Sequence, residues 1–183
     1  HTTQPDIFND VTFLVLHICS FEESYVRLTP YDAVELINKV YNEIEKTIRK
    51  YDVYCFNSVG GKYAVVSGCP TRNCDKHAKE VAELVVDIFR ATGNISAPII
   101  QGSIRLAGAI HTGPAMALVV GNGARRYELF GQTLAVTHLL EAACLQCYIP
   151  LKRVHCIGPG NRYTNHMHFE HFNNEMMVER PSD

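Results

Sequence analysis

The sequence lacks any hydrophobic run long enough to cross a membrane. No apolar stretch approaches the roughly 20 residues that a spanning helix needs, so we expect no membrane contact by this domain. An excess of charge is also missing, because 17 basic and 19 acidic residues leave a formal net charge of −2. Such a balance gives no general attraction to polyanions. Nucleic acid is therefore excluded as an expected partner.

A regular cysteine framework is absent as well. The seven cysteines are odd in number and irregularly spaced, which favours reduced thiols in a cytoplasmic setting over disulfides. Cys144 and Cys147 form a lone CxxC pair, which is weak evidence for zinc or redox chemistry without a second pair nearby. His166, His168 and His171 cluster without acidic or cysteine partners at ligand spacing, so a solvated strand is favoured there over a zinc site.

The chain has enough length and apolar content for one α/β domain. Its 183 residues are 46% hydrophobic and 20% charged, a composition typical of a globular chain with a sizeable core. We predict a single domain over residues 9–180, preceded by a linker at 1–8 and followed by a tail at 181–183.

The hydrophobic pattern of the first half predicts a strand, a helix and a hairpin. Residues 11–19 are apolar and β-branched, as in a buried strand. Thr29 is a good N-cap, Pro30 fits the first helical position, and Asp32 completes a capping box. Two strand-like runs then flank the glycine pair at 60–61, which predicts a tight turn.

The second half predicts a helix, further strands and another helix. An amphipathic helix covers residues 75–91, and residues 103–121 read as two strands joined by a turn at 113–114. A third helix covers 132–144, and short strands follow from Tyr148. The order β-α-β-β-α-β is that of a ferredoxin-like fold of the α/β (α+β) class, with additional C-terminal strands.

Four blocks of the chain resemble, in the same order, the catalytic homology domain of class III nucleotidyl cyclases, the adenylate and guanylate cyclases. The first two are `VTFLVLHICSF` and `YDVYCFNSVGGKYAVVSGCP`. The last two are `HTGPAMALVVG` and `RYELFGQTLAVTHLLEA`. Together they lie within residues 9–150, and the resemblance implies the class III cyclase fold.

The resemblance also implies a reaction that joins the 3′-hydroxyl of a nucleoside triphosphate to its α-phosphate, assisted by two metal ions held by two carboxylates. The first carboxylate of the family falls on His17 and the second on Gly61, which has no side chain. We therefore expect no cofactor and no Mg²⁺ binding. His17 is either a metal ligand beside other histidines or a satisfied histidine at a strand end, and we favour the second.

The remaining site positions implied by the resemblance are also changed. The two base-recognition positions of the family fall on Asn57 and Glu128, and the aspartate after the Leu-Phe-Gly block falls on Gln132. The asparagine that positions the ribose falls on Ala135, and the arginine that stabilises charge in the transition state falls on Leu139. Losing one electrostatic donor of this kind typically costs about 10²–10³ in rate. We therefore predict no catalytic residue in this chain.

These observations predict a catalytically inactive cyclase-homology domain that regulates cyclic-nucleotide signalling by dimerising with itself or with another class III cyclase-type domain. Two alternatives stay open: a nucleotide or small-ligand sensor that uses the old cleft, and an active cyclase with unorthodox ligands. Phe56, Tyr63 and Phe130 are candidates for the pairing surface, because they remain large and apolar in segments that would line it.

Overall fold

The computed structural model describes residues 4–19, 28–93, 95–97, 102–104, 106–146, 153–157, 168–172 and 175–179. Its helices are α2 (Pro30–Ile48), α3 (His77–Gly93) and α4 (Gln132–Gln146), with a short 3₁₀ turn η1 (Cys74–Lys76) before α3. Its strands are β1 (Asp6–Ile18), β2 (Tyr54–Val59), β3 (Lys62–Ser67), β4 (Ser96–Ala97), β5 (Gly102–Ser103), β6 (Leu106–Val120), β7 (Arg126–Phe130), β8 (Arg153–Ile157), β9 (His168–Phe172) and β10 (Glu175–Glu179). Within the described residues, no helix is long and apolar enough to span a membrane.

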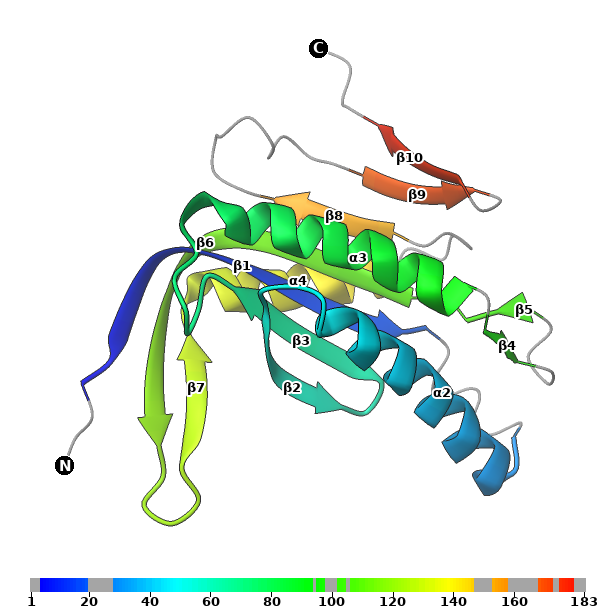
Figure 1. Ribbon diagram of the computed structural model, residues 1–183, viewed down its shortest axis with the longest axis horizontal. Coiled ribbons are helices and arrows are strands. Elements are labelled where there is room, and N and C mark those ends of the chain that lie inside the picture. Colours follow the sequence, from blue (N-terminus) through cyan, green and yellow to red (C-terminus); the bar gives the residue numbers. More distant parts are fainter. Residues whose placement is uncertain are drawn as a thin grey trace.

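The main sheet confirms the predicted fold class. Its strand order is β10-β9-β8-β6-β1-β3-β2, and β7 pairs with β6 outside this path. In the central part β6-β1-β3-β2, each strand is antiparallel to its neighbour. With α2 and α3 as the connecting helices, they form the βαββαβ arrangement of a ferredoxin-like fold. Strands β8 to β10 extend the sheet beyond β6 (Figure 1).

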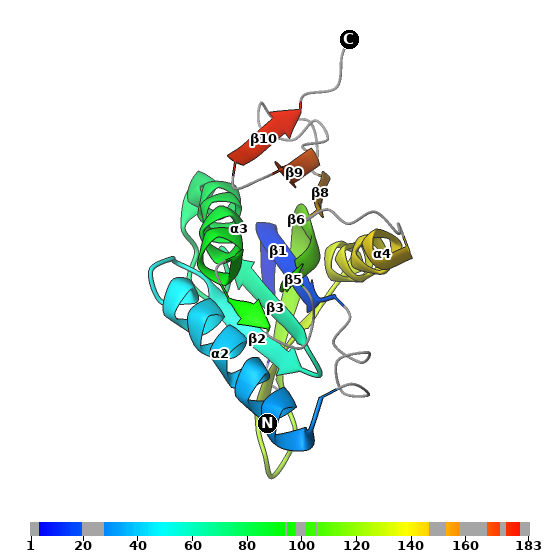
Figure 2. The same ribbon diagram turned by 90° about the vertical axis from the view of Figure 1, so that its right-hand side faces the viewer.

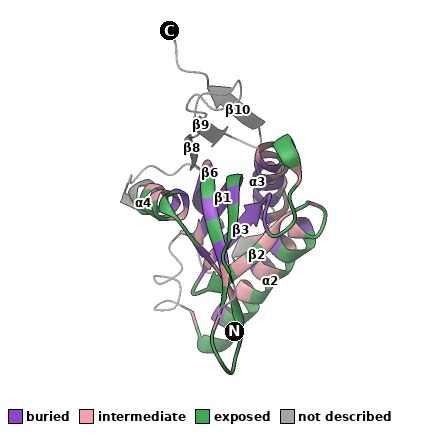
Figure 3. Cartoon of the chain, turned by 90° about the vertical axis from the view of Figure 1, so that its left-hand side faces the viewer, coloured by how far each residue is buried: buried purple, intermediate pink, exposed green. Residues whose placement is uncertain are grey.

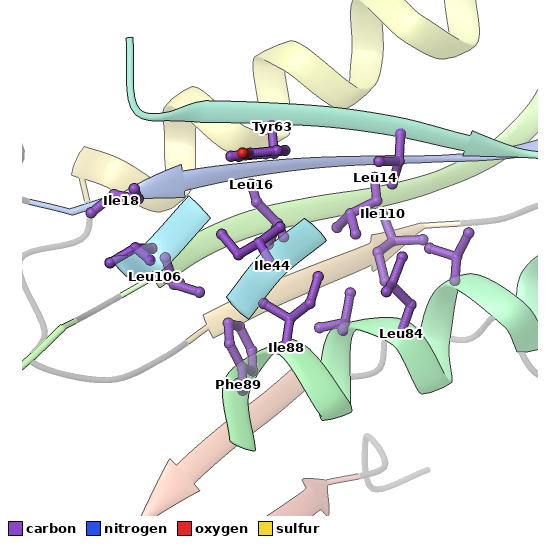
Figure 4. Close-up of a cluster of buried hydrophobic side chains, with 14 of the residues drawn as sticks. Leu14, Leu16, Ile18, Ile44, Tyr63, Leu84, Ile88, Phe89, Leu106 and Ile110 are labelled. Atoms are coloured by element: carbon purple, nitrogen blue, oxygen red, sulfur yellow. The ribbon is translucent and has the colours of Figure 1, made fainter. Parts of the chain in front are cut away.

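The helices cover both faces of the sheet. Figure 2 shows α2 and α3 on one face and α4 on the other. The larger apolar cluster lies between the sheet and α2 and α3 (Figure 4), where Leu14 and Leu16 of β1 meet Ile44, Leu84 and Ile88 of the helices. A second cluster contains Phe8, Val11, Phe13, Val66, Ala115, Ala117 and Leu129, with Leu134 of α4 packed against it. Alternating residues of β1 therefore serve opposite faces.

The start of α2 confirms the predicted capping. The Thr29 hydroxyl accepts a hydrogen bond from the Asp32 backbone N–H at 3.2 Å and donates one to the Asp32 carboxylate at 2.6 Å. Pro30 lies in the first turn, where its missing N–H costs no helical hydrogen bond. Residues 30–48 then bury Val40 and Ile44 against the sheet, whereas Val34 is 54% exposed.

The predicted turn at Gly113-Pro114 is wrong, because β6 runs unbroken from Leu106 to Val120. Gly113 pairs with Val11 of β1, and a β-carbon on it would lie 2.7 Å from the Thr133 hydroxyl oxygen. The Thr133 hydroxyl in turn donates to the Pro114 carbonyl at 2.6 Å. The glycine therefore permits the close approach of α4 to the strand.

The turn lies after β6 instead, where Gly121 has a φ of +98°. The β6–β7 hairpin projects from the body of the domain (Figure 1), and its far end is exposed (Figure 3). At the other end of the chain, β1 begins at Asp6, inside the segment predicted as a linker. The division into linker, domain and tail remains a prediction.

Candidate functional site

The two positions where the resemblance places metal-binding carboxylates lie side by side. His17 is the register partner of Lys62 in the β1–β3 pair, and the Ile18 N–H donates to the Gly61 carbonyl at 2.9 Å. Gly61 is buried and has a φ of +79°, a conformation that favours glycine. The structure therefore brings both positions together, with an imidazole at one and no side chain at the other.

The Gly60-Gly61 turn is fixed from α2. The Gly61 N–H donates to the Tyr41 hydroxyl at 3.0 Å. The Tyr41 ring meets the Tyr63 ring edge to face, with centroids 4.9 Å apart. Burial raises the pKa of Tyr63, and the nearby Glu45 carboxylate raises it further. Tyr41, packed edge to face on Tyr63, thus holds the hairpin turn beside His17.

A buried carboxylate from α4 lies next to these two positions. The Glu141 side chain is 1% exposed, and one of its oxygens, Oε2, accepts a hydrogen bond from Lys62 Nζ at 3.2 Å. Its other oxygen, Oε1, lies 3.7 Å from His17 Nδ1. Lys62 and His17 remain partly open to solvent, with side-chain exposures of 45% and 16%. Three ionisable groups from β1, β3 and α4 therefore meet at one end of the sheet.

Sequence reasoning missed both Glu141 and Lys62. Glu141 closes the fourth block that resembles the cyclases, and it is the only acidic residue between Glu128 and Glu170. An isolated acid in an otherwise apolar helix is the signal that could have identified it, because such a charge is rarely buried without a partner. Lys62 offered no comparable signal, since an isolated lysine beside a turn is ordinarily solvated.

The positions implied for the ribose and transition-state groups occupy another face of α4. Gln132, Ala135 and Leu139 are all exposed, Leu139 at 70%, and their i, i+3, i+7 spacing places them on one side of the helix. At 100° per residue, Glu141 lies on the opposite side from Gln132. The structure does not bring this exposed row together with His17 and Gly61 within one chain.

The two base-recognition positions lie on different hairpins. Asn57 is an exposed residue of β2, and Glu128 is a half-buried residue of β7. The two strands approach each other through Tyr54 and Tyr127, whose ring centroids are 5.8 Å apart. Burial raises the pKa of Tyr127. The strands that carry these two positions therefore approach each other where Tyr54 meets Tyr127.

The three pairing candidates differ in exposure. Tyr63 is 2% exposed, so it is a core residue and its assignment to a pairing surface is wrong. Phe56 is half-buried and meets Phe13 edge to face at 5.8 Å between centroids. Phe130 on β7 is 42% exposed and is the candidate best placed to contact another molecule.

Metal sites of the zinc type are not found in the described part of the chain, where no three His, Cys, Asp or Glu side chains gather in a suitable arrangement. Cys147 and His166 lie outside the described residues. The side chains of Cys144, His168 and His171 also lie outside what the structure describes. The expectations about the CxxC pair and the histidine cluster therefore remain predictions.

Residues 3–176 match the family described as the adenylate and guanylate cyclase catalytic domain. Catalytic domains of this family depend on Mg²⁺ or Mn²⁺, so the expectation of no cofactor and no Mg²⁺ binding is wrong. That expectation considered only His17 and Gly61, which offer no carboxylate. Glu141 supplies one beside His17, and its Oε1 atom has no hydrogen-bond partner among the described residues. An imidazole and a carboxylate are a donor set that fits a divalent cation.

The chain is also similar to curated guanylate cyclases. It is 33% identical over 142 residues to the soluble guanylate cyclase gcy-35 of Caenorhabditis elegans, covering 78% of this chain and 20% of that protein. It is 34% identical over 142 residues to guanylate cyclase 32E of Drosophila melanogaster, covering 76% and 12%. It is 33% identical over 153 residues to retinal guanylyl cyclase 1 of Bos taurus, covering 82% and 14%. The chain thus spans a fifth or less of the length of these relatives.

Solved cyclase domains share the fold. The guanylyl cyclase Cya2 superposes with a TM-score of 0.73 at 15% identity, covering 97% of this chain and 91% of that one. The guanylate cyclase domain of RhGC from Catenaria anguillulae, solved with GTP, gives 0.70 at 21%, covering 82% and 79%. A non-canonical dimeric guanylyl cyclase domain of the RhoGC fusion protein from Blastocladiella emersonii gives a TM-score of 0.69 at 22% identity, covering 82% of this chain and 80% of that one. Sequence and fold agree, and the chain belongs to the adenylate and guanylate cyclase catalytic domain family.

Proposed function

We propose that this domain does not itself cyclise a nucleotide and instead regulates cyclic-nucleotide signalling by pairing with another class III cyclase-type domain. The observation that carries the proposal is the exposed face of α4, where Ala135 and Leu139 stand at the ribose and transition-state positions. Neither side chain can donate a hydrogen bond or carry charge. Losing a single electrostatic donor typically lowers a rate by about 10²–10³, and here two roles are vacant.

The geometry extends the argument to both halves of a shared site. In an asymmetric cyclase dimer, as the family resemblance implies, one domain gives the metal carboxylates and the other gives the base, ribose and arginine groups. His17 and Gly61 lie at the ends of strands, whereas Ala135 and Leu139 lie on the exposed side of α4. Both sets are altered in this chain, so it would not complete a standard site in either role.

A row of exposed apolar side chains supports the pairing part of the proposal. Ile7 of β1 is opposite Met116 of β6, and Met116 is opposite Phe130 of β7, so the three share one face of adjacent strands. They are 66%, 39% and 42% exposed. Clustered exposed apolar residues mark interaction sites more often than isolated ones do. We call this set the β1–β6–β7 row.

The expected partner is a cyclase-type domain, either a second copy or a domain of the same longer protein. One solved neighbour is described as a non-canonical dimeric guanylyl cyclase domain, which supports pairing between domains of this family, and the same domain has also been solved as a monomer. The curated relatives are much longer than this chain. The cysteine content favours a cytoplasmic setting for such a protein.

The experiment measures turnover and association together. The purified domain is incubated with ATP or GTP and Mg²⁺ or Mn²⁺, alone and mixed with an active class III cyclase domain, and cyclic nucleotides are quantified by mass spectrometry. We expect no product from the domain alone, and complex formation in sedimentation velocity. Product above a protein-free control that disappears in His17→Ala would refute the first part. A strict monomer that binds no cyclase-type domain would refute the second.

A nucleotide sensor is the second candidate. Its support is the Lys62 ammonium, a partly exposed cation beside the glycine turn, and the GTP complex of one solved neighbour. A ligand that binds only the native state raises the melting temperature by mass action. A saturable shift with GTP or ATP, reduced in Lys62→Met, would favour this candidate. No shift at millimolar nucleotide would remove it.

A further inference from the structure

The connection between β3 and α3, which we call the 68–77 loop, contacts the start of β1. Arg72 Nη2 donates to the Ile7 carbonyl at 2.9 Å, and the Arg72 guanidinium carbon lies 4.6 Å from the centroid of the Phe8 ring. Strand β3 pairs with β1 only from Thr12 onward. Arg72 therefore binds the edge of β1 where no strand pairs with it, and it holds the segment that displays Ile7.

The same loop contacts β7, on the other side of the β1–β6–β7 row. Cys69 Sγ lies 3.2 Å from the Tyr127 hydroxyl oxygen, and β7 also carries Phe130. Asn73 Nδ2 donates to Ser67 Oγ at 3.0 Å, which ties the loop to the end of β3. The loop thus touches both strands that flank β6 in the row, so a change in the loop reaches the row.

A buried histidine closes the 68–77 loop where α3 begins. His77 is 8% exposed, and its Nδ1 atom lies 2.7 Å from the Thr12 hydroxyl oxygen of β1. That oxygen lies 2.8 Å from the Thr112 hydroxyl oxygen of β6. A β-carbon on Gly68 would lie 3.4 Å from the His77 β-carbon. The two ends of the loop therefore meet at this histidine, which fastens them to the sheet.

A proton on His77 opposes this arrangement. A neutral imidazole can accept the Thr12 hydroxyl at Nδ1, but an imidazolium can only donate, so the hydrogen bonds of Thr12 would have to reverse. Burial lowers the pKa of His77, and the nearby carboxylates of Asp10 on β1 and Asp75 on η1 offset this only in part. The cation would also lie at the N-terminus of α3, the positive end of the helix dipole. The closed loop therefore fits the neutral form.

We propose that the 68–77 loop is a pH-sensitive switch on the β1–β6–β7 row, in which protonation of His77 releases the loop from β1. The row then loses the support that Arg72 gives to the backbone of Ile7, and pairing with another cyclase-type domain weakens as the pH falls. This inference rests on the proposed pairing function and adds a condition under which pairing is lost.

Opening of the loop is measured without a partner, through two cysteines of the loop itself. Cys69 is 3% exposed, whereas Cys74 is exposed, and trypsin separates the two because it cuts after Arg72. The full chain is labelled briefly with N-ethylmaleimide at pH 7.5 and at pH 5.5, and the labelled peptides are quantified by mass spectrometry. Dividing Cys69 labelling by Cys74 labelling removes the pH dependence of the thiol reaction itself.

The labelling ratio of wild type should rise between pH 7.5 and pH 5.5. The limit is about tenfold, for uptake of one proton over the single pH unit below 6.5. The His77→Asn chain keeps an acceptor close to the Nδ1 position but does not titrate, so its ratio should stay constant. The matched control is His138→Gln, at an exposed histidine of α4, and it should respond as wild type does.

Sedimentation velocity then tests the link to pairing. The chain is run at both pH values, alone and mixed with an active class III cyclase domain. Wild type should lose its association at pH 5.5, and His77→Asn should keep it with the same partner. Circular dichroism at both pH values shows which variants are folded, and His77→Gln takes the place of His77→Asn if that chain does not fold.

The outcomes separate this switch from the pairing function. A wild-type labelling ratio that stays constant, or one that rises equally in the folded His77 variant, would overturn the switch. A ratio that rises while association is unchanged would overturn its link to the row. Absence of association at pH 7.5 would instead refute the proposed function, and the labelling ratio would still decide whether His77 opens the loop.

Discussion

Replacing Lys62 by Met should destabilise the domain far more than the loss of an ordinary surface ion pair. The change keeps a long apolar side chain but removes the ammonium that donates to Glu141 at 3.2 Å. The Glu141 carboxylate, at 1% exposure, would then be buried without its counter-charge. Because α4 packs mainly on β1 and β6 while Lys62 belongs to β3, the substitution also removes an ion pair that links the helix to the hairpin.

The size of the expected loss of stability follows from the solvent exposures of Lys62 and Glu141. Removing one partner of a fully buried pair costs about 3–5 kcal/mol, whereas an exposed pair contributes about 0–1 kcal/mol. Lys62 is 45% exposed and Glu141 is 1% exposed, so water can reach only one side of the pair. We expect an intermediate loss of about 2 kcal/mol in the free energy of unfolding. For a domain of this size that lowers Tm by roughly 4–8 °C.

The assay is chemical and thermal unfolding in EDTA, with Lys39→Met as the matched control. Lys39 pairs with Glu35 on α2 at 2.8 Å, and both side chains are more than half exposed, so its loss should change stability by less than about 0.5 kcal/mol. The double variant Lys62→Met with Glu141→Met should recover most of the loss, because an apolar pair can replace a buried ion pair. Equal effects of Lys62→Met and Lys39→Met would refute the reasoning.

Three further predictions address pH, activity and association. Burial lowers the pKa of His77 below 6.5, so its contribution to stability is complete above pH 6.5 and is lost as the pH falls toward the folded-state pKa. Wild type should therefore lose more Tm between pH 7 and pH 5.5 than His77→Gln, and equal losses would contradict this. His17→Asp with Gly61→Asp should not restore nucleotide cyclisation, because residues that act as a unit are not additive and Gly61 has a φ of +79°; robust turnover would show that the hairpin was misaligned. Phe130→Glu should weaken self-association or binding to a cyclase-type domain in sedimentation velocity, whereas Val34→Glu, at 54% exposure on α2, should not; matching effects would exclude the β1–β6–β7 row.

Much of the fold could be predicted because its signals are local. The capping of α2 by Thr29 depends on residues three apart, and the Gly60-Gly61 turn needs only two positive φ angles that glycine adopts easily. The continuous apolar run at 11–19 was sufficient to predict a buried strand there. The order of the four blocks was sufficient to identify the family, because comparing blocks along a sequence needs no information about contacts in the folded chain.

One error in the predicted elements and one in the predicted pairing surface came from contacts that are distant in sequence. Gly113-Pro114 has the composition of a turn, yet it continues a strand because Val11 pairs with Gly113 and Thr133 of α4 needs the space a side chain would fill. Tyr63 has the size of an interface residue, yet Tyr41 and the sheet bury it. Local composition favoured the wrong choice in both cases, and tertiary packing overrode it.

The sequence by itself determined which family positions had changed, because His17, Gly61, Ala135 and Leu139 are read directly from the aligned blocks. Only the tertiary structure decided what replaced them. Glu141 is 124 residues after His17 and 79 after Lys62, and no local pattern couples such positions. Their meeting depends on α4 packing across β1 and β6 while β3 pairs with β1. The groups around a buried charge determine its protonation and its interactions. These properties of Glu141 therefore arise only once the chain has folded.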